Sequence, residues 1–397
     1  MVPTRILGPW RPGAAMQTFS FIPLPVEVSA TFISLPQHYL EVCKSFKRHC
    51  NPFIYQTFLL LEKDYRKTNE SYKNEITIKI AGNNRLIPVQ RITDEDFETL
   101  IDTLRPHKNV TGLDVRYNLL TDDGAKHVAK LLEEVQSITY LNLMFNDIKT
   151  DGGEVIAKAL HRNQTLKHLR LTGNKIENKG GMFFATMLQI NSSLEKLDLG
   201  DCDLGMQSLI ALATVLTTNH SIKGINLNRP ILRSEEEEST IHMSHTLQIN
   251  STLIELHMCK HDIKNFGMQQ LCKALYSNTA LRYLDVSWLS IVSNNITGKG
   301  LTAFSDAMKT NTTLTNIYIW GNKFDSETCV AFSNLIKSGR LKPENTDVEP
   351  YVVDDCVYLA ELSHGIKRHY YWTPSYGEID GAAANAGLAI APSAKNL

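Results

Sequence analysis

The sequence lacks an excess of charge of either sign and lacks long apolar runs. Its 397 residues include 41 Lys and Arg against 42 Asp and Glu, so the formal net charge is −1. This balance gives no electrostatic case for nucleic acid or an anionic membrane as the main partner. No stretch approaches the ~20 consecutive apolar residues of a membrane-spanning helix, so we expect no membrane span.

Cysteine is scarce, and its spacing fits neither a disulfide framework nor a zinc site. The seven cysteines are odd in number and include no C-x-x-C pair. This usage predicts reduced thiols in a cytosolic or nuclear protein. The first 28 residues are rich in apolar side chains, but five prolines interrupt them, so we expect no secretory signal.

Sequence motifs of common enzymes are also missing. There is no phosphate-binding G-x-x-x-x-G-K-[ST], no G-x-G-x-x-G after a strand, no H-E-x-x-H and no G-x-S-x-G. One cluster, His257-Met258-Cys259-Lys260-His261, has zinc-ligand residue types. Strand alternation directs His257 and Cys259 to one face and His261 inward, so these side chains do not converge on one ion. We therefore expect no enzyme, no bound metal and no cofactor.

What the sequence does contain is a repeat. The pattern L-x-x-L-x-L-x-x-N, with substitutions, occurs nine times, and five consecutive copies begin 28 residues apart. The later spacings are 31, 28 and 33 residues, and a degenerate first copy precedes the others by 35. Repeats of this length indicate a solenoid. The copies begin at residues 75, 110, 138, 166, 194, 222, 253, 281 and 314.

Each copy changes its apolar period along its length. The end of the motif alternates as a short strand does, and 15 to 22 residues later the spacing is that of a helix face, as in Ile156, Ala157 and Leu160. One strand–loop–helix unit cannot bury its apolar face alone, so stacked units must share a core. We expect small residues to allow close packing just before the helices, at Gly124, Gly152, Gly180 and Gly267.

The period and the full helix resemble the ribonuclease-inhibitor type of leucine-rich repeat. The resemblance implies an α/β solenoid, or horseshoe, with parallel strands on the concave face and helices on the convex face. In that family the Asn of each copy points inward and binds backbone groups of the turn. The matching residues here are Asn83, Asn118, Asn146, Asn174 and Asn322.

Four central repeats depart from that pattern. Cys202, Pro230, His261 and Leu289 replace the Asn, and we expect Asn294 to take that role after extra residues around Trp288 to Val292. The acidic run Ser234 to Ser239 lies in another expansion, and we expect a solvated loop for its Glu235 to Glu238. The insertions are either tolerated at the surface or form a protruding contact site.

Five segments follow from these patterns. Residues 1–35 form an irregular Pro-rich segment, and 36–74 a helical N-terminal cap of two helices broken near Asn51-Pro52. Residues 75–342 form the solenoid of about nine repeats, since solenoid ends need caps. Residues 343–372 form a C-terminal cap with a strand and turn in Asp347 to Leu362, and 373–397 a flexible Gly- and Ala-rich tail. Tyr370, Tyr371 and Trp372, just before the tail, either dock on the cap or anchor a partner.

Five of the N-x-[ST] sequons share one phase of the repeat. Each Asn lies three residues before the first apolar residue of the next copy, where a helix end needs a polar cap. We therefore expect these asparagines to serve the fold and not to carry glycans. They are Asn163, Asn191, Asn219, Asn250 and Asn311.

Strand alternation also identifies the side chains that can meet a partner. Tyr, Trp and Arg most often dominate binding energy, and two aromatic clusters result, one near Tyr140 and one near Tyr283. We expect these side chains to be exposed on a rigid concave sheet, although the C-terminal cap could cover the second cluster. The partner-binding candidates are Arg116, Tyr140, Phe145, Arg170, His257, Tyr283, Trp288, Tyr318 and Trp320.

We interpret the protein as a non-enzymatic protein-interaction scaffold. One alternative is a structural component of a large multi-protein assembly such as a ciliary axonemal complex. The other is a regulator of a small GTPase, because GTPase-activating proteins for Ran share the repeat type and use a loop Arg; Arg116 and Arg170 are the arginines on the concave strands. The layout of caps and repeats resembles one group of intracellular adaptors, which implies the cytoplasm, the nucleus with its nucleolus, or the ciliary axoneme.

Overall fold

The computed structural model describes residues 34–68, 75–85, 87–232, 237–287 and 294–362. The Pro-rich segment 1–33, Trp288, Leu289, Glu235, the aromatic residues 370–372 and the tail lie outside the described residues. The chain divides into two units, Met1–Ser34 and Leu35–Leu397, and the second contains every described helix and strand. Among these described helices, none combines the length and the apolar character that crossing a bilayer requires.

Nine short strands form one sheet and pair in sequence order, all of them parallel. The resemblance to a leucine-rich repeat solenoid is thereby confirmed, because each repeat motif supplies one strand. The strands are β1 Ile76–Lys79, β2 Val110–Asp114, β3 Tyr140–Asn142, β4 His168–Arg170, β5 Lys196–Asp198, β6 Gly224–Asn226, β7 Glu255–His257, β8 Tyr283–Asp285 and β9 Asn316–Tyr318.

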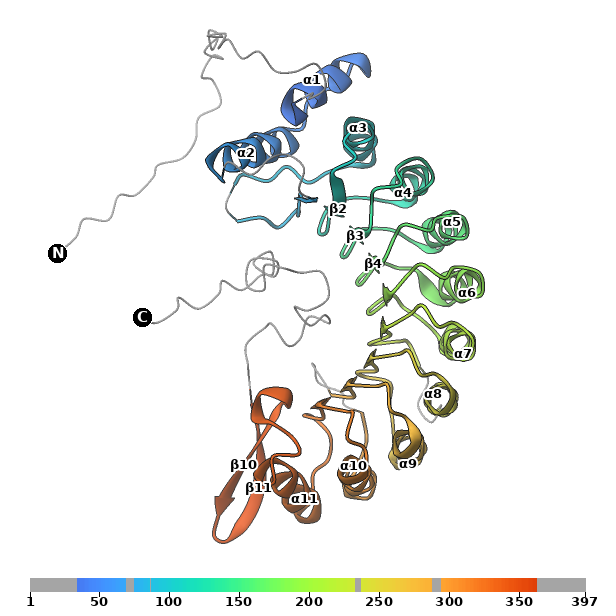
Figure 1. The fold of residues 1–397 in the computed structure, drawn as a ribbon, viewed down its shortest axis with the longest axis vertical. Coiled ribbons are helices and arrows are strands. Elements are labelled where there is room, and N and C mark those ends of the chain that lie inside the picture. Colours follow the sequence, from blue (N-terminus) through green and yellow to red (C-terminus); the bar gives the residue numbers. More distant parts are fainter. Residues whose placement is uncertain (1–33, 69–74, 86, 233–236, 288–293, 363–397) are drawn as a thin grey trace, which may run out of the picture. The chain divides into compact units, whose positions relative to one another are not determined.

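A helix follows each strand, and the helices stack side by side on the outer side of the sheet (Figure 1). The apolar residues of the strands and of the inward helix faces form one continuous core, as the alternating periods predict. The helices are α3 Asp94–Leu104, α4 Asp122–Glu134, α5 Thr150–Leu160, α6 Glu177–Leu188, α7 Met206–Leu216, α8 Glu238–Ile249, α9 Asn265–Ser277, α10 Gly298–Thr310 and α11 Ser326–Lys337.

Two helices precede the first repeat, α1 Leu35–Ser45 and α2 Pro52–Thr68, and they break at the predicted Asn51-Pro52. Pro52 suits the first helical position because its missing N–H has no partner there in any helix. The Asn51 side chain accepts from the Phe53 amide (3.0 Å) and donates to Asp96 of α3 (2.9 Å), so it joins this pair of helices to the solenoid.

A buried asparagine ladder runs along the ends of the strands. Asn146 Oδ1 accepts from the Leu120 amide (3.1 Å) of the preceding repeat, and its Nδ2 donates to the carbonyls of Val115 (3.1 Å) and Leu143 (2.9 Å). Asn118, Asn174, Asn294 and Asn322 also bind backbone carbonyls from this position. At the two ends of the ladder, the Oδ1 atoms of Asn83 and Asn322 have no hydrogen-bond partner.

A second asparagine ladder lies where the helices end. The five sequon asparagines of this phase are at most 7% exposed. Asn219 shows the pattern: its Nδ2 donates to the carbonyls of Leu188 (2.9 Å) and Asn191 (3.0 Å) of the preceding repeat, and its Oδ1 accepts from the amides of Ser221 and Ile222. Arg340 ends the ladder by donating to the carbonyls of Met308, Asn311 and Leu314. These side chains hold the repeats in register, which explains the sequons.

Side chains at the start of one helix cap the start of the next. Asp122 Oδ1 accepts from the amides of Lys149 (2.7 Å) and Gly152 (3.0 Å). A Cβ on Gly152 would lie 2.5 Å from that oxygen, so the small residue is required for the cap. Glu237 does the same for Lys264 and Gly267, and Glu238 begins α8, so the expected solvated loop is wrong for both residues.

The C-terminal end differs from the expected terminal strand of the main sheet. A short 3-10 turn, η1 Pro343–Asn345, leads into a separate antiparallel hairpin, β10 Val348–Val353 and β11 Cys356–Glu361. Thr346 forms an isolated parallel bridge with Ile317 of β9. The hairpin forms because Asp354 and Asp355 adopt the left-handed conformation that a two-residue turn needs.

Candidate partner-binding face

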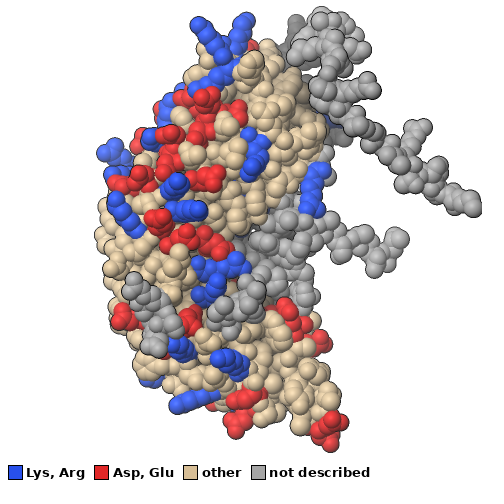
Figure 2. Space-filling view, turned by 180° about the vertical axis from the view of Figure 1, so that it is seen from behind, with Lys and Arg blue, Asp and Glu red and all other residues tan. Residues whose placement is uncertain are grey.

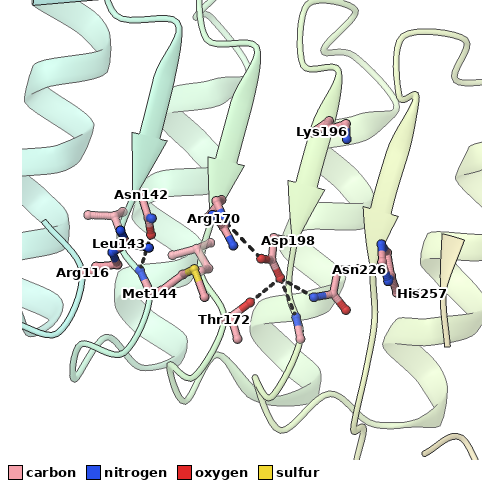
Figure 3. A network of polar contacts seen from close by, with 12 residues as sticks. Arg116, Asn142, Leu143, Met144, Arg170, Thr172, Lys196, Asp198, Asn226 and His257 are labelled. Atoms are coloured by element: carbon pink, nitrogen blue, oxygen red, sulfur yellow. Dashed lines mark hydrogen bonds and ion pairs between the residues drawn. The ribbon is translucent and has the colours of Figure 1, made fainter. Parts of the chain in front are cut away.

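The concave face consists of the strand side chains that point away from the helices. In the middle of the sheet these positions carry charged or polar residues in successive strands: Arg170 on β4, Lys196 and Asp198 on β5, Asn226 on β6 and His257 on β7 (Figure 3). The opposite strand face is apolar and belongs to the core. The side chains at the concave positions therefore do not belong to the apolar core.

Asp198 is the centre of one polar network. Its carboxylate lies 3.4 Å from Arg170 Nε, accepts a short hydrogen bond from the Thr172 hydroxyl and accepts another from Asn226 Nδ2 at 2.8 Å. The Gly200 amide also donates to it (3.2 Å). The network thus links three neighbouring strands by side chains as well as by their backbone (Figure 3).

A second network joins β5 to β7 across Gly224. In the strand register Gly224 stands between Lys196 and Glu255, and its missing side chain lets Lys196 Nζ reach the Glu255 carboxylate. The other Glu255 oxygen lies 2.9 Å from His257 Nε2, and His257 Nδ1 lies 3.5 Å from Asp285 on β8. Two cations and two carboxylates therefore alternate along one line.

Burial and charge act in opposite directions on the pKa values of this network. Burial lowers the pKa of Lys196 to about 7, although the Glu255 carboxylate raises it. Burial alone would also lower the pKa of His257, but its bonds to Asp285 and Glu255 raise it to about 9. Burial raises the pKa of Glu255, yet His257 and Lys196 outweigh it and leave that pKa low. We conclude that His257 is an imidazolium and Glu255 a carboxylate at neutral pH.

Aromatic rings continue the face toward the C-terminal end. The Tyr283 ring lies 4.7 Å from the His257 ring and 5.1 Å from the Tyr318 ring, measured between centroids. Trp320, just after β9, is half-buried, and its ring centroid lies 5.8 Å from that of Phe324.

A buried carboxylate, Asp347, closes this end of the face. Burial raises its pKa to about 7, while the amides of Ile319 and Trp320 donate hydrogen bonds to it.

The N-terminal aromatic cluster is built differently. The Tyr140 hydroxyl accepts from Asn142 (3.3 Å), and its ring meets the His168 ring edge to face at 6.3 Å. Phe145 leaves the strand with a φ of +52° and stacks on Tyr117 at 4.6 Å. Arg116 Nε pairs with Asp114 of its own strand at 3.2 Å.

The expected exposure of these side chains is wrong for most of the candidates. Six of them are at most 9% exposed: Arg116, Tyr140, Arg170, His257, Tyr283 and Tyr318. Neighbouring strands lie only ~4.8 Å apart, so paired charges and touching rings cover one another. Phe145 and Trp320 are half-buried. Arg116 and Arg170, the arginines that a GTPase regulator would need to project, are held by Asp114 and Asp198.

Strand alternation places Lys196, Asp198, Glu255 and Asp285 on this face as well, but the binding candidates chosen from the sequence did not include them. The available signal was opposite charges at equivalent strand positions of nearby repeats, with Gly224 opening the path between two of them. The structure also separates the residues of the zinc-like cluster, since His261 Nε2 binds the Leu227 carbonyl at 2.8 Å while His257 binds carboxylates. Within the described ranges, no three His, Cys, Asp or Glu side chains could together hold a metal ion.

The outer surface carries charges of both signs. Figure 2 shows Lys and Arg interspersed with Asp and Glu over the face it presents, without a large area of one sign. Along the helices, Lys126 pairs with Asp123 (2.6 Å) and Lys158 with Glu154 (2.6 Å). Exposed pairs of this kind contribute little to stability.

The match to a family model agrees with the fold. The leucine-rich repeat family model matches residues 136–157, 162–185 and 191–213. Leucine-rich repeat-containing protein 34 of Mus musculus is 54% identical over 91% of this chain and 99% of its own length, and that of Rattus norvegicus is 58% identical over the same shares. The Homo sapiens protein of that name is 56% identical over 96% of this chain and 91% of its own length. Among solved structures, leiomodin-1 actin-binding site 2 aligns with a TM-score of 0.28 and 17% identity, over 47% of this chain and 87% of that one.

Proposed function

This chain belongs to the family of leucine-rich repeat-containing protein 34, and we propose that it is a non-enzymatic scaffold that binds a protein partner through its concave face. Leucine-rich repeats commonly serve protein–protein interaction. The observation that carries the proposal is the line of charged and aromatic side chains on β4 to β9, at positions that neither the core nor the asparagine ladders use.

Stability alone does not account for that line of charges. Replacing a buried ion pair by apolar residues is commonly neutral or stabilising, because both charges lose their hydration. The Lys196–Glu255–His257–Asp285 network keeps four ionisable groups at such positions. Because these groups are buried and paired, they order the concave face, and the less buried Lys79, His168 and Trp320 are the positions that a partner can contact.

The two asparagine ladders support the same proposal. They bind backbone groups of successive repeats and hold the strands in a fixed register before any partner arrives. A face that is already ordered loses little entropy on binding, so a few anchor residues suffice for useful affinity. The Lys196–Glu255–His257–Asp285 network pairs its charges with one another, which holds the strands rigidly and leaves none of its groups placed to transfer a proton.

A specific observation favours a second candidate, a building block of a large assembly such as an axonemal complex. The C-terminal hairpin leaves Tyr351, Val352, Val353 and Tyr358 about half exposed, and the Tyr351 and Tyr358 rings stack at 5.5 Å. Permanent assembly would cover these side chains. Limited proteolysis tests this candidate, which predicts that the hairpin resists cleavage only within the assembly.

We also propose an intracellular location, in the cytoplasm or in the nucleus with its nucleolus, or at the axoneme. All seven cysteines are unbonded, and six of them are at least partly buried. Asn163, Asn191, Asn219, Asn250 and Asn311 are buried in the ladder, where a glycan would not fit. Fluorescence imaging of the tagged chain in its native cell type would test the location.

The concave face can be tested by affinity capture with two matched variants. The concave variant is Lys79→Glu/His168→Ala/Trp320→Ala, at positions that are not fully buried. The convex control is Lys126→Glu/Tyr276→Ala/Phe266→Ala, on exposed positions of α4 and α9. Circular dichroism first establishes that both are folded. We expect proteins captured by the wild type to be lost with the concave variant and retained with the control. Loss with the control alone would refute the concave face as the binding site.

A further inference from the structure

A row of residues in the left-handed conformation lies where the strands lead into their loops. They occupy the eighth position of successive repeat motifs, and we call the row the exit rim. Its members are Tyr117, Phe145, Gly173, Asp201, Arg229 and Lys260, with φ between +50° and +76°.

The fold imposes this backbone conformation. Amides of the rim donate to carbonyls of the next repeat, as Tyr117 to Met144 (2.9 Å), Phe145 to Thr172 (2.8 Å) and Arg229 to Cys259 (2.9 Å). Such bonds hold a strained φ in place whatever the side chain. Glycine adopts this conformation without strain, and Gly173 and Gly321 show that the repeat accepts it here.

Bulky side chains at the other positions therefore need a reason other than the backbone. A left-handed Tyr, Phe, Arg or Lys is disfavoured because its Cβ approaches the following carbonyl oxygen. Strained residues of this kind cluster at binding sites. The rim places four of them within six consecutive repeats, which points to a role for the side chains themselves.

One half of the rim is a flat aromatic surface. The Tyr117 and Phe145 rings are 4.6 Å apart and within 14° of parallel. The neighbouring glycine makes room for them, because a Cβ on Gly173 would lie 2.3 Å from Phe145 Cδ1. An aromatic face of this kind packs well against an apolar side chain.

The other half is polar with an excess of positive charge. Arg229 pairs with Asp201 at 3.3 Å, and the exposed Lys260 follows in the next repeat. One carboxylate against two cations favours an acidic group on the partner. Strands lie ~4.8 Å apart, so Phe145 and Arg229, three repeats apart, are separated by about 14 Å, the length of about four extended residues.

We propose that the exit rim binds an extended peptide segment of a partner protein, with an apolar residue on Tyr117–Phe145 and an acidic residue four to six positions away on Arg229 and Lys260. The segment crosses the repeats along the edge of the concave face. This binding does not depend on the concave-face function, because the rim residues lie outside the strands and outside their charge network.

Selection from a random twelve-residue peptide library on the full chain tests the proposal. The enriched peptides are synthesised, and their Kd values are measured by fluorescence anisotropy. We expect an apolar residue and an acidic residue at the stated spacing. We expect Tyr117→Gly/Phe145→Gly and, separately, Arg229→Gly/Lys260→Gly to weaken binding at least tenfold. The single exposed reversal Lys260→Glu, which leaves the rim backbone untouched, should weaken it as well.

Two controls separate this site from other causes. Lys47→Gly relieves a left-handed residue (φ +54°) outside the rim and should leave the Kd within twofold. The concave variant Lys79→Glu/His168→Ala/Trp320→Ala should also leave it unchanged, so the rim and the concave face can fail separately. The Tm of Arg229→Gly/Lys260→Gly should equal or exceed that of the wild type. The proposal would be overturned if no peptides are enriched, if their consensus lacks the stated spacing, or if the rim variants bind as tightly as the wild type. A Tm of Arg229→Gly/Lys260→Gly below that of the wild type would overturn it as well.

Discussion

The sharpest prediction concerns Glu255, which binds two buried cations at once. Its carboxylate contacts Lys196 across Gly224 and lies 2.9 Å from His257. Glu255→Ala removes both contacts while Lys196 and His257 stay buried, and losing one partner of a buried pair costs about 3–5 kcal/mol of unfolding free energy. Lys196→Met leaves Glu255 bonded to His257, so we expect a cost within about 1 kcal/mol.

The double variant and the pH dependence follow from the same geometry. Adding Lys196→Met to Glu255→Ala removes one of the buried charges, so we expect about 2 kcal/mol to be recovered. The folded-state pKa of Lys196 is lowered from 10.5 to about 7, so the cost of keeping it charged is fully present below pH 7 and disappears as the pH rises. Glu255→Ala should therefore be less destabilising at pH 9 than at pH 6.

Urea unfolding followed by circular dichroism measures these differences as shifts in midpoint at constant slope. Glu195→Ala is the matched control, because Glu195 pairs with Lys223 at 2.7 Å near the surface, where an ion pair contributes about 0–1 kcal/mol. If Glu255→Ala costs no more than Glu195→Ala, or if Lys196→Met restores nothing, the reasoning about the buried network is refuted.

Three other predictions concern the repeat itself. His261 occupies a ladder position, and burial lowers its pKa to about 4. The unfolding free energy that depends on neutral His261 is therefore fully present above pH 6.5 and is lost as the pH falls toward 4. In urea titrations, His261→Asn should remove about 2 kcal/mol of the destabilisation that the wild type shows between pH 7 and pH 5. Asn219→Ala leaves buried backbone groups without partners and should cost at least about 2 kcal/mol by the same assay, whereas a cost near zero would contradict the ladder's role. Gly152→Ala displaces the Asp122 cap and should cost about 1–2 kcal/mol, and Asp122→Ala combined with it should add little in a double-mutant cycle.

The repeat made most of the fold predictable. Strand alternation and helical spacing placed the core, and the phase of the sequons predicted that Asn163 or Asn219 would cap a helix end, because one copy explains the others. The period could not predict features that occur once. The C-terminal hairpin depends on contacts that have no equivalent in the repeats. The cap made by Glu237 repeats the one made by Asp122, but the acidic run around Glu237 concealed that equivalence.

The sequence predicted which side chains lie on the candidate face but not whether they are exposed. Alternation puts Tyr283 and His257 on the concave side, yet exposure depends on what the neighbouring strands carry. The Lys196–Glu255 contact spans 59 residues of sequence and passes over Gly224, so a motif read one repeat at a time does not reveal it. The left-handed rim was hidden for a different reason, because a bulky residue gives no sequence signal of a positive φ.

The most direct test of the concave-face proposal is site-specific photo-cross-linking of the full chain in its own cell type. A photoreactive phenylalanine analogue replaces His168 on β4 in one variant and the exposed Phe266 on α9 in the other. The account predicts that a protein partner cross-links from position 168 and not from position 266. Cross-links from position 266 alone, or from neither position, would contradict it.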